Sequence, residues 1–420
     1  MCSDAPGEFD HLSPDYVRNF HAINREFAEK CPVSWSDVHG GFWALTGYEA
    51  VKKASADDDL FSSWHDLPDG STPFRGVDIP GQMVRGSFLE LDAAAHKPWR
   101  SQFNPWFTPD TVQARWSARA RELAAWCVDR VIERGSMEVI EDLAGPVPAM
   151  ITLELLGLPL SEWKVLSMAA HDSIATPGGT AEHAAAEKAF VALFSSIPEV
   201  VAERRANPKD DLLTALGSMT INGAKLTDQE IIDATILVIS GGVDTTTNLT
   251  AQTINYLAAS HEDRRRLTAD RSLLKTACEE FLRYFSPVTM NGRTITQDTD
   301  LQGIRLSRHQ RVLLSWAAAN SDPNHWDQPD TVIIDRKPNR HLAFGLGVHR
   351  CIGSHLAREM FAAMMNAFLD RIPDYEVNGK VEPYETLGNV NGLRKLPIRF
   401  APGQARGLRI PELESSEQGA

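Results

Sequence analysis

Several features that would assign this 420-residue chain to other functional classes are missing from its sequence. There is no run of roughly 18 apolar residues that could cross a membrane, and the first residues are too polar for the apolar core of a secretion signal. The five cysteines form no Cys-x-x-Cys pair, so neither a zinc site nor a disulfide framework is indicated. We therefore expect a cytoplasmic protein without a membrane anchor, in a reducing compartment.

The charge balance and one missing motif exclude two further classes. The formal net charge is −14, which argues against wholesale nucleic-acid binding. No G-x-G-x-x-G follows a predicted strand, so the chain lacks a flavin or nicotinamide site of its own. If the protein performs redox chemistry, its electrons must come from separate proteins.

Apolar periodicity predicts that most of the chain is helical. Apolar residues recur at helical spacing over about 109–134 and 183–206. Thr227 and Glu230 form a capping box, and the helix that follows could run to about Ser260. Such a helix is far longer than the average helix of a globular protein.

Strand signals are shorter and lie late in the chain. They cover 293–296, 311–314 and 392–398, and the Asn291-Gly292 pair predicts a turn before the first of them. No linker or low-complexity stretch divides a chain that is 43% hydrophobic. We expect a mainly α fold with a smaller β region (α+β), in one domain over residues 1–420.

A glycine-hinged loop places one cysteine just before a predicted helix. The stretch reads Phe344-Gly345-Leu346-Gly347-Val348-His349-Arg350-Cys351-Ile352-Gly353. A helix N-terminus stabilises a thiolate through its unpaired N–H groups and its dipole. The two glycines let the backbone bend closely around whatever the sulfur contacts. A small buried hydrophobe, the usual role of a free cysteine, would leave these neighbours unexplained.

Asp244 and Thr245 follow two glycines inside the long predicted helix. The apolar run 236–239 leads through Ser240 into Gly241 and Gly242, and three threonines follow Asp244. Glycine and β-branched threonine are poor residues for a helix interior. A tight crossing with another helix would explain the glycines. The alternative is a local break in the helix that opens a groove over a ligand, with an acid and a hydroxyl beside it.

Other charged residues are less specific by themselves. His96 and Arg100 lie four residues apart on one face of a predicted helix, and Arg293 follows the predicted turn. All three could be surface cations. Glu280 and Arg283 have the i, i+3 spacing that occurs on many exposed helices.

Taken together, these segments resemble the cytochrome P-450 family. The cysteine loop matches the haem-binding signature Phe-Gly-x-Gly-x-His-x-Cys-x-Gly, and the other segments follow in the family's order between about 90 and 400. One departure precedes His96, where the family often has Asp-Pro-Pro and this chain has Asp92-Ala93-Ala94-Ala95. The resemblance implies the P-450 fold, with haem b between the long central helix and the Cys-loop helix.

The resemblance also implies roles for individual residues. The cofactor-binding set would be the axial cysteine, the phenylalanine beside its sulfur, two glycines and four propionate ligands: Cys351, Phe344, Gly353, Gly241, His96, Arg100, Arg293 and His349. Cys351 would be the metal ligand. Asp244 and Thr245 would be catalytic and relay protons. Glu280 and Arg283 would form a structural pair that braces the proximal side.

The implied activity is insertion of one oxygen atom from O₂ into a hydrophobic terpenoid, steroid or polyketide-like molecule. Family positions place seven residues in the substrate pocket, and ordinary core packing would explain each equally well: Leu237, Ser240, Val288, Thr289, Met290, Asn389 and Val390. Two alternatives are a peroxygenase driven by hydrogen peroxide and a haem-thiolate sensor without turnover. Neither of these two alternatives would need the pair of Asp244 and Thr245.

The expected partners are O₂, the substrate, and a ferredoxin or flavodoxin with its reductase. Five basic residues near the cysteine loop could steer an acidic partner, or could be a solvated face: Arg336, Lys337, Arg340, Arg350 and Arg358. The protein is expected to be a monomer.

Overall fold

The computed structural model describes residues 7–66, 74–81, 85–176 and 179–417. The chain forms two compact units. The first comprises Met1–Ser101, Glu279–Ile352 and Thr386–Asn391, and the second comprises Gln102–Cys278, Gly353–Glu385 and Gly392–Ala420. The single domain expected from the sequence stays a prediction, and each unit is described by itself.

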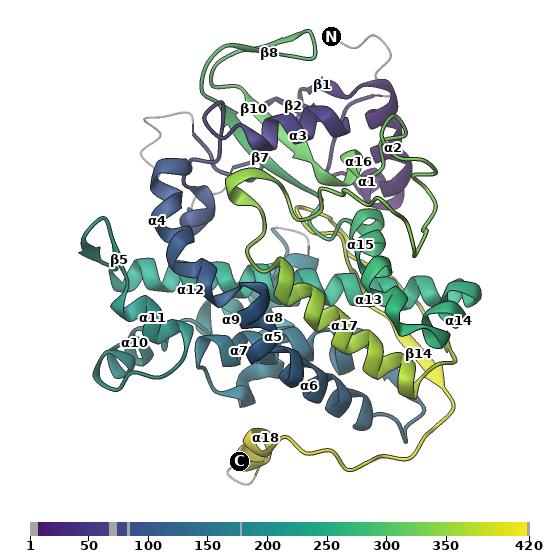
Figure 1. Ribbon diagram of the computed structural model, residues 1–420. Helices are drawn as coiled ribbons and strands as arrows, with labels where there is room; N and C mark the ends of the chain where they lie inside the picture. The colour runs from purple at the N-terminus through teal and green to yellow at the C-terminus, as the bar shows by residue number, and fades with distance from the viewer. Residues whose placement is uncertain (1–6, 67–73, 82–84, 177–178, 418–420) are drawn as a thin grey trace. The chain divides into compact units, whose positions relative to one another are not determined.

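A five-stranded sheet forms the centre of the first unit (Figure 1). Its strands, in spatial order, are β1 (Val33–Ser36), β2 (Phe42–Leu45), β10 (Arg311–Ser315), β7 (Met290–Ile295) and β3 (Phe61–Ser62). β10 is parallel to β2 and antiparallel to β7. Apolar side chains of this sheet, such as Leu45 and Val312, are buried with those of α3 (Tyr48–Ala56) in one core.

The predicted turn at Asn291-Gly292 is wrong, because both residues lie inside β7. Gly292 pairs with Leu313 of β10. A Cβ at position 292 would lie 2.7 Å from the Arg311 guanidinium and 3.2 Å from the Val77 carbonyl oxygen. The glycine therefore serves close packing around a central strand rather than a turn.

Short helices and one hairpin complete the first unit. They are α1 (Pro14–Arg18), α2 (Phe20–Lys30), α16 (Trp316–Ala319) and the pair β8 (Thr299–Leu301) and β9 (Ile304–Leu306). α4 (Ala93–Phe103) and α15 (Leu274–Phe285) each cross the boundary between the units along the chain. Cys31 is disulfide-bonded, so the expectation that the cysteines are all reduced is wrong for this residue. The spacing of cysteines in a sequence does not show which of them meet in the fold.

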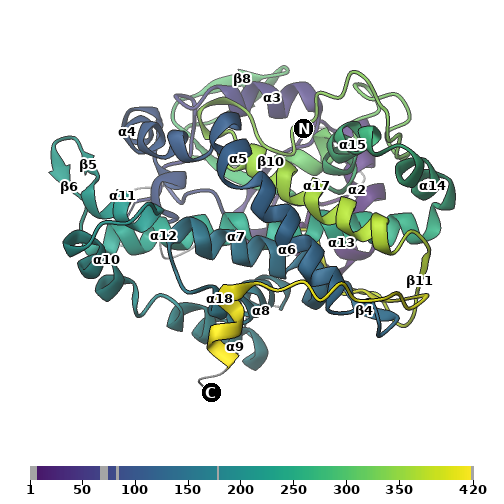
Figure 2. The same cartoon turned by 60° about the horizontal axis from the view of Figure 1, so that its bottom comes forward.

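The second unit is mainly helical. Its helices are α5 (Pro109–Arg115), α6 (Ser117–Asp129), α7 (Pro146–Leu156), α8 (Trp163–Ala175), α9 (Ala181–Ala192), α10 (Ile197–Ala206), α11 (Leu212–Ser218), α12 (Asp228–Gly242), α13 (Asp244–Ala259), α14 (His261–Ala269), α17 (Ser354–Arg371) and α18 (Pro411–Glu417). α17 packs along α6 (Figure 2). The helices predicted over 109–134 and 183–206 are each divided in two.

Small strands accompany these helices. β11 (Tyr375–Val377), β14 (Pro397–Phe400) and β4 (Ser136–Glu138) form a three-stranded sheet. β12 (Glu382–Pro383) pairs with β13 (Leu393–Lys395), and β5 (Thr220–Ile221) pairs with β6 (Ala224–Lys225). The mainly α architecture with a smaller β region is confirmed.

The long helix predicted after Thr227 exists, and it is interrupted once. The Thr227–Glu230 capping box is present at the start of α12. Val243, with φ −90° and ψ −69°, separates α12 from α13. Asp244 is therefore the first residue of a new helical segment.

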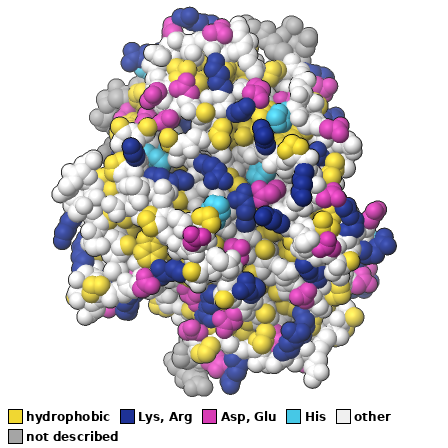
Figure 3. Space-filling model, viewed as in Figure 1, with side chains coloured by type: hydrophobic (Ala, Val, Ile, Leu, Met, Phe, Trp, Pro, Cys, Tyr) yellow, Lys and Arg dark blue, Asp and Glu magenta, His cyan; other side chains and the backbone are white. Residues whose placement is uncertain are grey.

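The surface shows no gross separation of charge on the face drawn in Figure 3, where acidic and basic side chains are interspersed. Within the described ranges, the chain contains no helix of the length and apolar character needed to span a membrane.

Candidate active site

The cysteine loop of the first unit is shaped by two glycines in left-handed backbone conformations. Gly345 has φ +65° and Gly347 has φ +73°. A Cβ at Gly347 would lie 2.5 Å from the carbonyl oxygen of Ser55, so a larger residue would not fit there. The Cys351 N–H donates to the Phe344 carbonyl at 2.8 Å, which closes the loop on itself. α17 begins three residues later along the chain, with Gly353 as its N-cap.

Buried basic groups gather near this loop in the first unit. Arg293 is 6% exposed, and among the described residues its guanidinium donates only to the neighbouring Gly292 carbonyl, at 2.7 Å. Both ring nitrogens of His349 are buried and make no hydrogen bond of normal geometry to a described residue, although the ring lies close to the Leu91 backbone. The ring of His96 lies 4.4 Å from that of His349, centroid to centroid.

Burial shifts the pKa values of these groups toward their neutral forms. Burial lowers the pKa of His349 to about 2, with Arg293, His96 and Arg100 adding to the effect. Burial also lowers the pKa of His96 to about 4 and that of Arg293 to about 10. Asp92, Asp58 and Glu90 act on Arg293 through space, but its printed hydrogen bond goes to a backbone carbonyl, and buried donors without direct anionic partners are costly. A ligand with two carboxylates, such as haem with its two propionates, therefore fits these residues.

α4 positions His96 and Arg100 although the family's prolines are missing. The His96 N–H donates to the Asp92 carbonyl at 2.8 Å, which starts the helix. The Asp92 carboxylate accepts hydrogen bonds from the Ser62 hydroxyl at 2.6 Å and the Ser63 N–H at 2.8 Å. Arg100 donates to the carbonyl of Arg350 in the cysteine loop at 2.6 Å. The predicted His/Arg pair therefore does reach the loop.

Glu280 and Arg283 form a fully buried ion pair that holds several backbone segments. Both side chains are 0% exposed, and two N–O distances between them are 2.9 Å. Arg283 also donates to the Asn320 carbonyl at 2.8 Å. Asn339 donates to Glu280 at 3.0 Å. The pair is thus the centre of a network in the first unit, in keeping with a structural role.

Arg336 belongs to this network, which sequence reasoning missed. Its side chain is 9% exposed and its Nε lies 3.0 Å from the Glu280 carboxylate. The interpretation of Arg336 as part of a solvated or docking face is therefore wrong. It lies 56 residues from Glu280 in the sequence, so no local spacing could have revealed the contact.

In the second unit, the side chains of Asp244 and Thr245 make separate contacts. Asp244 is 1% exposed, and its carboxylate is bound by His171, Asn248 and Tyr384. The Thr245 hydroxyl instead donates to the Gly241 carbonyl at 3.0 Å. His171 and Tyr384 lie 73 and 140 residues from Asp244, whereas the i+4 spacing of Asn248 could have been recognised.

The two glycines before Asp244 have different roles. A Cβ at Gly242 would lie 3.2 Å from the Thr152 hydroxyl of α7, which is the close approach expected at a helix crossing. A Cβ at Gly241 would meet nothing within 4 Å. Close packing between helices therefore explains Gly242. Gly241 borders open space instead, as expected if a break in the helix opens a groove.

Five of the predicted pocket residues come from the first unit. Val288 and Val390 form an isolated antiparallel bridge, and the Thr289 N–H donates to the Asn389 carbonyl at 2.9 Å. Thr289 and Met290 are 0% exposed. Leu237 and Ser240 lie on α12 of the second unit. The assignment of all seven to a substrate pocket stays a prediction.

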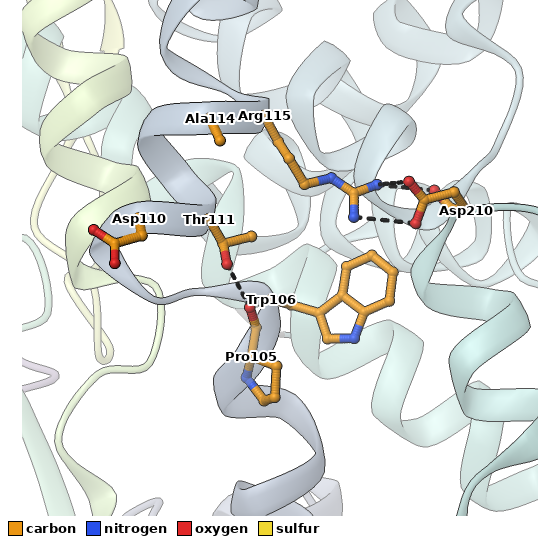
Figure 4. A pocket seen from close by; sticks show the side chains of 7 residues that line it. All are labelled: Pro105, Trp106, Asp110, Thr111, Ala114, Arg115 and Asp210. Atoms are coloured by element: carbon orange, nitrogen blue, oxygen red, sulfur yellow. Dashed lines mark hydrogen bonds and ion pairs between the residues drawn. The ribbon is translucent and has the colours of Figure 1, made fainter.

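Two concave regions of the second unit contain none of the predicted site residues. One, of about 580 Å³, has Arg115 ion-paired with Asp210 at 3.0 Å and lying over the Trp106 ring (Figure 4). The other, of about 460 Å³, is apolar apart from Glu162 and Ser196 and is lined by parts of α7, α8, α9 and α12. Arg115 is already paired with Asp210, so its own charge is not open to a ligand.

Comparison with known proteins decides the family. The family model for cytochrome P450 matches residues 171–373. A steroid C26-monooxygenase of Mycolicibacterium smegmatis is 32% identical over 366 residues, which cover 86% of this chain and 88% of that protein. The chain belongs to the cytochrome P450 family. Cyclomarin C epoxidase CymV of Salinispora arenicola is 31% identical over 395 residues, covering 92% and 98% of the two chains.

Solved structures agree with this assignment. The crystal structure of the P450 CYP109E1 from Bacillus megaterium in complex with testosterone has a TM-score of 0.81 and 29% identity, covering 92% of this chain and 99% of that one. The protein is a haem-thiolate monooxygenase, an oxidoreductase that incorporates molecular oxygen and uses protoporphyrin IX haem. The predictions of fold, reaction class and cofactor from the P450 motifs are confirmed.

Proposed function

We propose that this P450 binds haem through Cys351 and oxidises a mid-sized hydrophobic molecule of the steroid, terpenoid or polyketide kind. The observation that carries the ligand assignment is the group of buried, anion-deficient side chains beside the cysteine loop, above all Arg293 and His349. When bound, haem supplies an iron that activates O₂, and a cysteine thiolate donates the electron density that favours O–O cleavage.

Four residues of the first unit would bind the propionates. Arg293 and Arg100 can each pair with a carboxylate through two N–H groups. His349 and His96 would donate ring N–H groups, because a nearby anion offsets the burial and the neighbouring cations that lower their pKa values. Phe344 and Gly353 would flank the cysteine, one on each side of it along the chain.

The acid and the alcohol of the second unit would handle protons. Asp244 presents a buried carboxyl group, and Thr245 presents a hydroxyl next to the open space at Gly241. A general acid held in a fixed position transfers its proton to one particular oxygen atom, because only that atom lies within hydrogen-bond reach.

The substrate class is supported by the relatives and by the chemistry of the pocket residues. One relative is named for a steroid and another for cyclomarin C, and the solved relative holds testosterone. Val288, Met290 and Val390 are apolar, while Thr289 and Asn389 add small polar groups. Such linings suit hydrophobic ligands with a few hydrogen-bonding groups.

The proposed activity is tested by screening and then by isotope labelling. Steroids, terpenoids and polyketides are screened for the shift of the haem from low to high spin. For the best binder, we expect the product made under ¹⁸O₂ to carry one ¹⁸O atom, and the product made in H₂¹⁸O under ¹⁶O₂ to carry none. Turnover with hydrogen peroxide alone at the rate of the reductase-driven reaction would instead identify a peroxygenase.

Electrons would come from a ferredoxin or flavodoxin with its reductase. Lys337, Arg340 and Arg350 are exposed residues of the first unit close in sequence to the cysteine loop, and they would attract an acidic partner. Raising the ionic strength from about 0.05 to 0.5 M should slow reduction several-fold, because salt screens exposed charges. Rates that do not respond to salt would remove this docking mode. The cytoplasmic location and the monomeric state remain predictions.

A further inference from the structure

Asp244 lies in a buried polar cluster of which the proposed function uses only one member. His171 lies on α8, Asp244 and Asn248 lie one turn apart at the start of α13, and Tyr384 directly follows β12. Their exposed fractions are 7%, 1%, 0% and 0%, respectively. Three separate segments of the second unit thus bring polar groups to one site that is almost closed to solvent.

The Tyr384 hydroxyl lies 3.0 Å from Nδ1 of His171 and 2.9 Å from Oδ1 of Asp244, and the contacts with the carboxylate have a defined direction. A carboxylate only accepts, so Nδ1–H of His171 donates to Oδ1 of Asp244 across 2.9 Å. The Tyr384 hydroxyl donates to Oδ2 of Asp244 at 2.8 Å and accepts from Nδ2 of Asn248 at 2.8 Å. Nδ2 of Asn248 also lies 2.9 Å from Oδ2 of Asp244. Both carboxylate oxygens are therefore held by these three partners.

The hairpin of β12 and β13 fixes two members of the cluster. Oδ1 of Asn248 accepts from the Leu393 N–H at 3.0 Å, and the Tyr384 N–H donates to the Gly392 carbonyl at 3.0 Å. A Cβ at Gly392 would lie 2.3 Å from Oδ1 of Asn248, so only glycine fits beside this amide. Asn248 and Tyr384 are therefore firmly placed next to Asp244.

His171 is the member that can change its charge near neutral pH. Its Nε2 is buried and lacks a hydrogen-bond partner among the described residues. Burial opposes protonation of the ring, but Asp244 outweighs it and Asp172 and Glu138 add to the effect, so the pKa of His171 is raised above 6.5. Burial and Asp244 raise the pKa of Tyr384 well above 10, so its hydroxyl keeps its proton.

We propose that His171 is a positioning residue of the proton relay, which holds Asp244 and supplies from Nδ1 the proton that Asp244 passes on. One proton moves from Nδ1 of His171 to Oδ1 of Asp244, leaving a neutral imidazole and a neutral carboxyl group. After the carboxyl group gives up this proton, one proton from bulk solvent returns to the imidazole through the 7% of His171 that stays exposed, and no electron moves in the exchange. Tyr384 and Asn248 keep the carboxyl group in place. This role rests on the proposed function of Asp244.

The first test replaces His171 by a residue that donates but cannot titrate. In His171→Asn the amide can still donate to Asp244. We expect the yield of product per electron pair to fall several-fold, because O₂ is then reduced by two electrons and two protons to hydrogen peroxide. In the wild type this yield of product per electron pair, the coupling, should decline as the pH rises through the pKa of His171, because the imidazolium is lost there. In the variant, coupling should be low and flat over that range.

The matched control is His183→Asn, which removes another histidine of the same unit, on α9. His183 pairs with Glu187 at 3.4 Å and lies outside the cluster, so coupling and pH profile should match the wild type. Wild-type coupling in His171→Asn would overturn the proposal. So would lower coupling with an unchanged pH profile, because a loss of packing alone gives that result.

Stability provides a readout that needs no turnover. Because the folded-state pKa of His171 is raised, its stabilising effect is fully present below the unfolded pKa of about 6.5 and is lost as the pH rises through the folded pKa. The difference in Tm between wild type and His171→Asn should shrink over that range. A difference that stays constant with pH would contradict the titration of His171.

Thr245→Ala distinguishes a failure of this inference from a failure of the proposed function. Loss of the hydroxyl should raise hydrogen peroxide formation while leaving the pH dependence in place. Unchanged coupling in Thr245→Ala would overturn the acid–alcohol relay itself. Normal uncoupling in Thr245→Ala, with no effect of His171→Asn, would overturn the role of His171 alone.

Discussion

Replacing Glu280 by Gln is expected to lower the free energy of unfolding by about 3–5 kcal/mol, the usual cost of breaking a buried ion pair from one side. The carboxylate is 0% exposed and is shared by Arg283 and Arg336. Glutamine has nearly the same shape but no charge, so two buried guanidinium groups would lose their counter-charge. The midpoint of urea unfolding measures the effect.

The neighbouring Glu279→Gln is a matched control, because the same chemical change occurs at the adjacent position. The Glu279 side chain is 27% exposed and its partner is His341, at 3.1 Å. A half-buried pair of this kind should contribute less than about 1 kcal/mol. Equal losses of stability in the two variants would mean that the Glu280 network contributes no more than an ordinary surface pair.

The loss of Glu280 should also reduce haem content. Arg283 holds the carbonyls of Asn320 and Pro329, and Glu280 itself accepts from the Ile333 N–H at 2.9 Å. These bonds fix the segment that leads to the cysteine loop within the first unit. A Glu280→Gln protein that folds should therefore be purified with less haem per chain than Glu279→Gln.

Features that depend on nearby residues could be predicted from the sequence. The capping box at Thr227, the helix that carries His96 and Arg100, and the strand at 311–314 all have local signals, and the structure contains each of them. The cysteine loop is also local, since two glycines and the closing bond from Cys351 to Phe344 lie within eight residues of sequence.

Features that depend on contacts between distant residues could not be predicted from the sequence. Asn291-Gly292 has strong turn propensity, but pairing with β10 and packing against Val77 place it in a strand. Arg336 is indistinguishable from a surface cation until the fold brings it to Glu280. His171 and Tyr384 likewise reach Asp244 only through tertiary structure, so the sequence showed the acid but not what holds it.

Cys351→Ser is expected to have the largest effect on function, with complete loss of monooxygenase turnover. A serine hydroxyl is a far weaker electron donor than a thiolate at neutral pH, so the electron donation that favours O–O cleavage is lost. The substitution removes one sulfur atom from a partly exposed position, so the fold should be retained. Product formation from a substrate found in the spin-shift screen measures the loss.

Cys127→Ser is the matched control for the same chemical change. Cys127 is 0% exposed on α6, and burial raises its pKa to about 12, so it stays a neutral thiol. A neutral buried thiol cannot serve as the anionic ligand of a metal. This variant should lose some stability and keep its turnover.

The carbon monoxide spectrum of the reduced protein tests the assignment of Cys351 most directly. A thiolate opposite carbon monoxide shifts the Soret band strongly to the red, and the wild type and Cys127→Ser should both show this band. Cys351→Ser should bind haem without it. Survival of the red-shifted band in Cys351→Ser would contradict the account, because another group would then be the thiolate ligand.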